Sequence, residues 1–376
     1  MISILFLIPT LDRGGAENVL VNLVNHMDQS KFRITVQTLF DKDSQKDRLR
    51  PGIEYRSFLY KQFHGNSRLQ ARLPARLLYR LIVGKRYDIV VSYLEGPTAH
   101  ILSGCPFKDT KKVAWFHVEM DRDRQLSAGF RSKEAALAAY RDYDRVVFVA
   151  ESVKRSIERL AGQPFQHTHV LYNTVNTEEI RQKAKEDIPD ALFSKDYCNI
   201  VSVGRIIPAK GYDHLVRIHK RLTEDGYPCR FFVLGEGSDR MELEQYLREN
   251  DLTETFTFLG FQNNPYRYVS KADLFVCSSR REGFSTAVSE ALVLGVPVVS
   301  TNCSGAYELL GEADEYGIVT ENDEDSLYSG LKRLLADPEL LAFYRNRAKE
   351  RGRYFDTDHT VRAVEEMLLS LRNETA

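Results

Sequence analysis

Residues 274–300 read LFVCSSRREGFSTAVSEALVLGVPVVS. The stretch opens with a short apolar run, Leu274–Cys277, and then passes through a polar loop. Apolar residues recur at helical spacing in the next segment, and a second apolar run, Val296–Ser300, follows it directly. A strand, a helix and a second strand in this order predict a parallel sheet covered by helices.

The same alternation of short apolar runs and amphipathic segments extends over the rest of the chain. It breaks within the polar stretch 171–197 and then restarts, which predicts α/β architecture with two doubly wound, Rossmann-like domains facing across a cleft. We expect residues 1–175 to form an N-terminal domain and residues 176–355 a C-terminal domain. Residues 356–376 are expected to form a helix that crosses back to the first domain. The other expected strands are Ile2–Ile8, Arg33–Leu39, Ile89–Tyr93, Lys112–Phe116, Arg145–Val149, Ile200–Val203, Arg230–Leu234 and Phe256–Leu259.

The composition excludes several classes of protein. Of the 376 residues, 43% are hydrophobic and 28% are charged, as in ordinary globular proteins. The five cysteines contain no Cys-x-x-Cys spacing, which argues against a structural zinc site or a disulfide framework. The apolar start at Met1–Pro9 lacks a basic leader, and nothing approaches the roughly 18 apolar residues of a membrane span. We therefore expect a cytoplasmic protein that meets membranes only peripherally.

The net charge of −1 conceals an asymmetry between the two halves. Residues 1–175 hold 27 lysine and arginine residues against 18 acidic ones, whereas the remainder holds 25 against 35. This difference indicates two domains that face different partners, with simple drift of surface charge as the alternative. The near-neutral total argues against nucleic-acid binding.

Glycines mark several turns at expected strand ends. Gly14 and Gly15 lie between the first strand and the first helix, while Gly204 and Gly235 each follow a strand of the second half. Glycine lets the backbone approach a ligand closely, and a helix N-terminus offers unpaired N–H groups to an anion. The alternative is that these glycines serve only the turns.

Two cations stand on one of these turns. Arg205 and Lys210 lie between the strand Ile200–Val203 and a helical pattern at Asp213–Leu222. In this position both can converge on a diphosphate, arginine through a forked contact and lysine as a point charge. The alternative is a pair of solvated side chains on a surface loop.

Two glutamates flank the start of the helix in the opening stretch. Glu282 lies in the preceding loop, and Glu290 lies one turn or more into the helix, which should begin near Phe284 or Ser285. The first N–H groups of that helix, including that of Thr286, would point toward a phosphate. One carboxylate would then hold hexose hydroxyls and the other a ribose diol. Alternatively, both glutamates are helix-end or surface charges, but the apolar surroundings of Glu290 favour a partnered carboxylate.

Together, the Arg-x4-Lys pair, the Glu-x7-Glu pair and the glycine turn near the N-terminus resemble glycosyltransferase family 4. The resemblance runs over nearly the whole chain and is most specific in residues 200–310. It implies the GT-B fold and transfer from a nucleotide sugar with retention of anomeric configuration. In that fold the domain of residues 1–175 would bind the acceptor, and the domain of residues 176–355 would bind the nucleotide sugar. It also implies a role in bacterial capsule, exopolysaccharide or lipopolysaccharide synthesis, with UDP as the expected nucleotide and GDP as the alternative.

The resemblance further implies roles for individual residues. Arg205 and Lys210 would neutralise the leaving diphosphate, Glu290 would bind the ribose and Glu282 the donor hexose. Gly15 would lie under the diphosphate. The other groups expected to bind the donor are Gly14, Gly204, Gly235, Gly283, Phe284, Ser285 and Thr286.

In such enzymes a histidine after a central strand of the first domain contacts the donor sugar. His117 matches that place, with a packed core histidine as the alternative. Glu95 and Glu119, both near strand ends, are candidates to face the acceptor. The expected catalytic residues are His117, Glu282, Arg205 and Lys210.

We expect no metal ion and no other cofactor. Arg205, Lys210 and helix N-termini would stabilise the charge that develops on the leaving diphosphate, as magnesium does elsewhere. Asp-x-Asp pairs begin at Asp41, Asp121 and Asp142, but 53 acidic residues make such pairs common by chance.

Residues 68–86 contain six basic residues and no acid: Arg68, Arg72, Arg76, Arg80, Lys85 and Arg86. Four arginines at four-residue spacing form one stripe on a helix, beside a face of leucines. This pattern predicts a basic amphipathic helix on an anionic membrane, here the inner face of the cytoplasmic membrane. It also favours a lipid-linked acceptor, such as a saccharide on polyprenyl diphosphate. The alternative is a helix packed on the sheet by its leucines, with Pro74 interrupting or restarting it.

Two other functions fit part of this pattern. A UDP-sugar 2-epimerase of the same fold would need neither an acceptor nor a basic membrane face. A non-catalytic nucleotide-sugar-binding protein would not need the catalytic residues. A dinucleotide dehydrogenase is disfavoured because no Gly-x-Gly-x-x-Gly follows the first strand.

Overall fold

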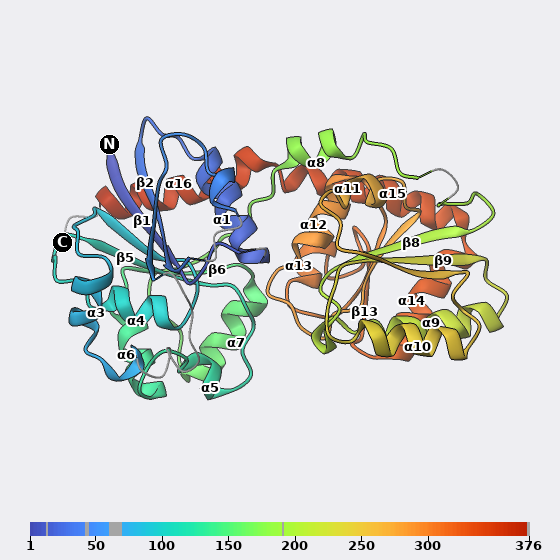
Figure 1. The fold of residues 1–376 in the computed structure, drawn as a ribbon, viewed down its shortest axis with the longest axis horizontal. Coiled ribbons are helices and arrows are strands. Elements are labelled where there is room, and N and C mark those ends of the chain that lie inside the picture. Colours follow the sequence, from blue (N-terminus) through green and yellow to red (C-terminus); the bar gives the residue numbers. More distant parts are fainter. Residues whose placement is uncertain (13, 42–44, 60–69, 190–191, 374–376) are drawn as a thin grey trace. The chain divides into compact units, whose positions relative to one another are not determined.

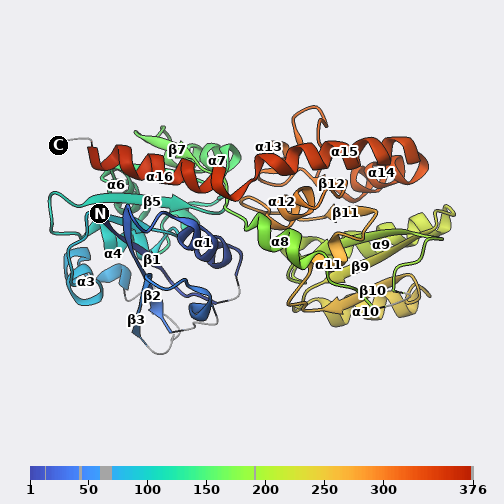
Figure 2. The same ribbon diagram turned by 90° about the horizontal axis from the view of Figure 1, so that it is seen from above.

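The computed structural model describes residues 1–12, 14–41, 45–59, 70–189 and 192–373. It divides into two compact units, the first of residues 1–174 and 357–376 and the second of residues 175–356. Each unit is a parallel sheet with helices on both faces, as Figures 1 and 2 show. The predicted class of two doubly wound, Rossmann-like α/β domains is therefore confirmed.

The first unit contains a seven-stranded sheet with the order β3-β2-β1-β4-β5-β6-β7. The strands are β1 (Ile2–Ile8), β2 (Phe32–Phe40), β3 (Glu54–Leu59), β4 (Ile89–Ser92), β5 (Lys111–Phe116), β6 (Arg145–Phe148) and β7 (Thr168–Val170). The helices are α1 (Gly15–His26), η1 (Lys46–Arg48), α3 (Ala75–Ile82), α4 (Pro97–Ser103), α5 (Asp123–Leu126), α6 (Lys133–Arg141), α7 (Glu151–Ala161) and α16 (Thr357–Asn373). In Figure 1, α1 and α16 cover one face of the sheet and α3, α4 and α6 cover the other.

The second unit contains a six-stranded sheet with the order β10-β9-β8-β11-β12-β13. The strands are β8 (Cys198–Val203), β9 (Cys229–Leu234), β10 (Phe256–Gly260), β11 (Leu274–Cys277), β12 (Val298–Thr301) and β13 (Ile318–Thr320). The helices are α8 (Thr177–Lys183), η2 (Pro208–Lys210), α9 (Tyr212–Glu224), α10 (Arg240–Glu249), α11 (Tyr266–Val269), α12 (Thr286–Val293), α13 (Ala306–Leu310), α14 (Glu324–Ala336) and α15 (Pro338–Tyr354). In Figure 1, α9, α10 and α14 lie on one face of the sheet and α11, α12 and α15 on the other.

The core of each unit is built on its central strands. All side chains from Ile4 to Ile8 in β1 and from Leu274 to Val276 in β11 are at most 1% exposed. Strands covered by helices on both faces bury every side chain, so they appear in the sequence as continuous apolar runs rather than alternating ones.

Each sheet has one point at which the strand order reverses. The reversal lies between β1 and β4 in the first unit and between β8 and β11 in the second. At such a point the chain leaves two neighbouring strands toward opposite faces, which opens a crevice at their carboxyl ends where ligands bind. The loops after β8 and β11, residues 204–211 and 278–285, meet at this point of the second unit.

The basic stretch 68–86 includes α3, which begins directly after Pro74. Proline caps the N-terminus of this helix, and therefore restarts it rather than kinking it. The buried side chains of α3 are Leu78, Tyr79 and Ile82. Leu77 and Leu81 are 43% and 59% exposed, beside the exposed Arg76 and Arg80. Arg68 and Leu69 lie outside the described residues.

No helix within the described ranges is both long and apolar enough to cross a membrane.

Candidate active site

The donor residues expected in the second unit meet at the reversal point between β8 and β11. Lys210, from the loop after β8, and Glu282, from the loop after β11, form an ion pair between Nζ and Oε1. Their side chains are only 22% and 14% exposed. The hydroxyl of Ser279 donates a second hydrogen bond, of 2.7 Å, to the same carboxylate oxygen. Desolvation would lower the pKa of Lys210, but the Glu282 carboxylate outweighs it and raises that pKa, so Lys210 stays cationic at neutral pH.

The loops around this pair contact each other through their backbones. A Cβ on Gly211, where φ is +65°, would lie 2.1 Å from the carbonyl oxygen of Ser278. A Cβ on Gly235, where φ is +151°, would lie 1.9 Å from the carbonyl oxygen of Gly204. Side chains at these two glycines would force the loops apart, so the glycines are required for the close approach.

Helix α12 begins at Thr286 and points its N-terminus into the same region. Ser285 is its N-cap, and the Ser285 hydroxyl accepts a hydrogen bond from the N–H of Val288. Helix geometry leaves the first N–H groups, those of Thr286 and Ala287, without intrahelical acceptors, which favours a nearby anion. The side chain of Phe284 is buried, so that residue would offer a ligand only its backbone.

Glu290 lies further along α12 and is partly buried. Burial raises the pKa of its carboxyl to about 7, although the hydrogen bond from Tyr266 acts in the opposite direction. The Tyr266 hydroxyl donates this bond to Oε1 at 3.2 Å. The negative charge of Glu179, on α8, adds to the increase. Glu290 therefore changes its ionisation close to neutral pH.

Arg205 differs from Lys210 in its surroundings. Its side chain is exposed, and no ion pair joins it to another residue of the described chain. The aliphatic part of Lys210 runs beside Gly204, with Cδ and Cε 3.6 Å from the place a Cβ would take there. The two cations therefore flank one short turn, but only Lys210 is held by a counterion.

The predicted residues of the first unit lie at the carboxyl ends of β1, β4 and β5. His117 follows β5 and is 6% exposed. Its backbone N–H donates to Oε2 of Glu95 at 3.1 Å, so Glu95 holds the start of this loop. Burial raises the pKa of Glu95 and lowers that of His117 to about 3, which leaves the imidazole neutral. Among the described atoms, Nε2 of His117 is buried without a hydrogen-bond partner.

Three further predicted residues of the first unit are Gly14, Gly15 and Glu119. Gly14 is the N-cap of α1 and Gly15 is its first residue, so both belong to the turn after β1. Glu119 lies two residues after His117 and is partly exposed. The ring of His117 packs against that of Tyr93 in a tilted arrangement, with centroids 4.7 Å apart.

Two residues that hold the glutamates were missing from the sequence-based prediction. The Ser279 hydroxyl donates a hydrogen bond to Glu282, and the Tyr266 hydroxyl donates one to Glu290 from a different helix. Ser279 stands three residues before Glu282, so its proximity was available from the sequence. Tyr266 lies 24 residues from Glu290, and only the packing of α11 against α12 reveals the contact.

Solved structures with this architecture define the fold class. Anabaena HepE in complex with UDP matches with a TM-score of 0.79 and 18% identity, over 98% of this chain and 100% of HepE. Sucrose-phosphate synthase from Thermosynechococcus elongatus matches with a TM-score of 0.79 and 16% identity, over 100% of both chains. At these identities the likeness shows the fold alone, and that fold is GT-B, as the resemblance implied.

Two family models match consecutive parts of the sequence. The model described as Glycosyltransferase Family 4 matches residues 13–179, and the model described as Glycosyl transferases group 1 matches residues 183–351. The chain belongs to glycosyltransferase family 4.

Two relatives illustrate the similarity. The N-acetylgalactosamine-N,N'-diacetylbacillosaminyl-diphospho-undecaprenol 4-alpha-N-acetylgalactosaminyltransferase of Campylobacter jejuni is 42% identical over 189 residues, which are 50% of this chain and 49% of that relative. The lipopolysaccharide core biosynthesis glycosyltransferase LpsD of Rhizobium meliloti is 29% identical over 330 residues, 87% of this chain and 86% of LpsD. The match thus spans about half the length of the first relative and most of the second.

Proposed function

We propose that the protein is a retaining glycosyltransferase that uses a UDP-sugar. It would transfer a hexosyl or N-acetylhexosaminyl group to a hydroxyl of a lipid-linked saccharide during the synthesis of a cell-surface polysaccharide. The observation that carries the proposal is the Lys210–Glu282 ion pair beside the N-terminus of α12. A cation, a carboxylate and the first N–H groups of a helix lie together at the carboxyl end of the sheet, and folds of this class bind ligands at that end.

The chemistry follows from the charges of this site. Cleavage of the bond between the anomeric carbon and the diphosphate oxygen leaves negative charge on the diphosphate. Lys210, Arg205 and the N–H groups of α12 would stabilise that charge without rearranging. The acceptor hydroxyl would attack from the same face, and its proton would pass to the departing phosphate. Glu282 would hold the hexose hydroxyls, and Glu290 the ribose diol.

The first unit would supply a polar contact to the transferred sugar. His117 is neutral, and its buried Nε2 has no hydrogen-bond partner among the described residues. This nitrogen is therefore suited to a hydrogen bond with a sugar hydroxyl. Glu95 would position His117 through the backbone bond at 3.1 Å. Glu119, two residues after His117 and partly exposed, would face the acceptor.

The nucleotide and the acceptor are inferred from chemistry and from the relatives together. A carboxylate on a ribose diol and a cation at a diphosphate suit any nucleoside diphosphate sugar, and UDP is the nucleotide bound to HepE. The name of the Campylobacter relative specifies a diphospho-undecaprenol acceptor. The exposed Leu77 and Leu81 beside Arg76 and Arg80 support a peripheral site on an anionic membrane, where such an acceptor resides.

We infer that catalysis needs no metal ion. In two Asp-x-Asp pairs, lysines engage three of the four acids: Asp123 by Lys133 at 2.8 Å, Asp144 by Lys111 at 3.4 Å, and Asp142 by Lys112. The fourth acid, Asp121, lies 3.8 Å from Arg122. Asp41 belongs to a third pair, whose second member, Asp43, lies outside the described residues. The charge on the leaving diphosphate would instead be met by Lys210 and Arg205.

A donor screen tests this function. The purified protein is incubated with a panel of UDP- and GDP-sugars, and nucleotide release is measured with EDTA and with added manganese. We expect slow hydrolysis of one or a few UDP-sugars, equal in EDTA and in manganese. Turnover of GDP-sugars alone would reject the UDP assignment, and activity that EDTA abolishes and manganese restores would reject the metal-free mechanism.

The two alternatives make different predictions in the same assay. A 2-epimerase would convert UDP-N-acetylglucosamine alone into a second sugar, which is visible by chromatography without any acceptor. A non-catalytic binding protein would bind the nucleotide and release nothing. The intact pair of Lys210 and Glu282 argues against the non-catalytic protein.

A further inference from the structure

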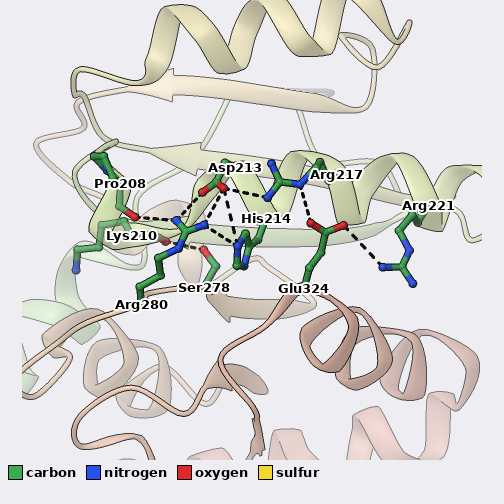
Figure 3. Close-up of polar contacts among 9 residues, drawn as sticks. All are labelled: Pro208, Lys210, Asp213, His214, Arg217, Arg221, Ser278, Arg280 and Glu324. Carbon is green, nitrogen blue, oxygen red and sulfur yellow. Dashed lines mark hydrogen bonds and ion pairs between the residues drawn. The ribbon is translucent and has the colours of Figure 1, made fainter.

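Arg280 lies two residues before Glu282 and reaches back to the loop after β8 (Figure 3). Its Nη1 donates to the carbonyl oxygen of Pro208 at 2.8 Å and to Oδ1 of Asp213 at 2.7 Å. Its Nη2 donates to Oδ2 of Asp213 at 2.7 Å and to Nε2 of His214 at 2.6 Å. One guanidinium therefore satisfies four acceptors that lie just before and just after Lys210 in the chain.

Backbone contacts join the same two loops between these points. The N–H of Arg280 donates to the carbonyl oxygen of Ala209 at 2.8 Å. The hydroxyl of Ser278 donates to the carbonyl oxygen of Lys210 at 2.8 Å, as Figure 3 shows. Gly211 touches Ser278 through the backbone contact described above. Residues 208–214 are thus fastened to residues 278–280 along their whole length.

The groups around Arg280 have the ionisation states that suit a guanidinium, namely a charged Asp213 and a neutral His214. Asp213 also accepts from Arg217 at 2.9 Å, and Arg217 in turn donates to Glu324 at 2.6 Å. Burial would raise the pKa of Asp213, but the hydrogen bonds from Arg280 and Arg217 outweigh it and hold that pKa well below its usual range. Burial and the charge of Arg280 lower the pKa of His214, so a neutral imidazole accepts the bond at Nε2.

We propose that Arg280 is a positioning residue that fixes the loop after β8 to the loop after β11 and so presents the Lys210 ammonium to the donor diphosphate. The inference rests on the proposed function, because only that function assigns Lys210 to the diphosphate. A lysine at position 280 would keep the charge, but it lacks the planar fork that reaches both Asp213 oxygens and the Pro208 carbonyl together. Arg280 itself need not touch the donor.

A double-mutant cycle on nucleotide affinity tests the proposal. UDP is titrated by calorimetry into the wild type, Arg280→Lys, Lys210→Ala and the double variant. If Arg280 acts through Lys210, Arg280→Lys weakens UDP binding by about fivefold in the wild type and by less than about twofold once Lys210 is gone. A purely structural role would weaken binding equally in both backgrounds.

The controls separate positioning from folding. Arg347 is a matched arginine that bridges α15 to the carbonyl oxygen of Glu315 at 2.7 Å, with 29% of its side chain exposed against 36% for Arg280. Arg347→Lys should leave UDP affinity unchanged. Thermal unfolding shows whether Arg280→Lys folds. If it does not, Asp213→Asn takes the place of Arg280→Lys in the cycle, because it removes the charge that the Arg280 guanidinium binds.

The outcomes distinguish this inference from the function on which it rests. Additive losses, or an Arg280→Lys variant with wild-type affinity, would overturn the positioning role while leaving the transferase proposal intact. If the wild type binds neither UDP nor GDP, the proposed function fails and the role of Arg280 fails with it.

Discussion

At the scale of single residues, Glu290 is an ionisable side chain on a largely apolar helix. Val288, Ala291 and Leu292 are each at most 1% exposed, and Glu290 stands among them with one hydrogen bond from Tyr266. The sequence placed a carboxylate among apolar neighbours and therefore predicted that it has a partner. It could not identify the partner, because Tyr266 comes from another helix.

The pKa of Glu290 predicts how nucleotide affinity depends on pH. Only the ionised carboxylate would accept hydrogen bonds from both hydroxyls of the ribose diol, and burial places the pKa of this carboxyl at about 7. Affinity for UDP should therefore fall as pH decreases through 7, by about fivefold to tenfold between pH 8 and pH 6. Calorimetric titration of UDP at several pH values measures the effect.

The control for this prediction is Glu290→Gln, which cannot titrate at this position. Its affinity should be weak at every pH, and any slope that remains reports the ionisation of UDP itself. A wild-type profile parallel to that of Glu290→Gln would show that Glu290 does not face the ribose.

His117 separates nucleotide binding from sugar transfer. Its neutral, buried imidazole is suited to the sugar and not to the diphosphate, so His117→Gln should lower kcat by on the order of 100-fold. The same variant should bind UDP within about twofold of the wild type, since UDP carries no sugar at that place. An equal loss of UDP affinity and of kcat would assign His117 to the nucleotide or to the fold instead.

At the scale of elements, the strands that sequence reasoning missed share a position in the sheets. These strands, β3, β7 and β13, all lie at sheet edges. An edge strand is covered less completely, so β3 and β7 contain no fully buried residue and show no continuous apolar run. The central strands were predicted to within a few residues, because their burial on both faces forces such runs.

Helix α3 carries a prediction at the same scale. Leu77 and Leu81 are exposed together with two arginines, and anionic headgroups stabilise each bound basic residue by about 1 kcal/mol. The double variant Arg76→Glu/Arg80→Glu should therefore reduce partition onto anionic vesicles by about tenfold or more. Vesicle flotation at low and at physiological salt measures the partition.

A matched pair on the second unit provides the control. Arg248→Glu/Arg353→Glu makes the same change of charge at two exposed positions outside α3 and should leave partition unchanged. Equal recovery of the wild type from anionic and from neutral vesicles would refute the membrane role of α3.

At the scale of the whole molecule, the order of the strands brings the site together. Lys210 and Glu282 are 72 residues apart and lie on the loops after β8 and β11, which are neighbours only because the sheet reverses there. The sequence predicted that each residue stands at a strand end, and the family resemblance assigned both to the donor. The strand order, and with it the direct ion pair, depends on packing that a single sequence does not reveal.

The C-terminal helix belongs to the first unit. Helix α16 follows the second unit in sequence and packs in the first, where Leu368 and Leu371 are fully buried and Glu365 accepts from the N–H of Asp28 at 2.6 Å. The prediction from the sequence was a helix over residues 356–376 that crosses back to the first domain. The particular contacts of this helix, such as that of Glu365 with Asp28, depend on the complete fold.

In the proposed transferase, the second unit binds a nucleotide diphosphate sugar through α12 and the loops after β8 and β11. Titration of UDP into the wild type and into Glu290→Ala is the sharpest test of this binding site. We expect saturable binding to the wild type and affinity weakened by about tenfold or more in Glu290→Ala, with the fold intact by thermal unfolding. Undiminished UDP affinity in Glu290→Ala would contradict the site described here.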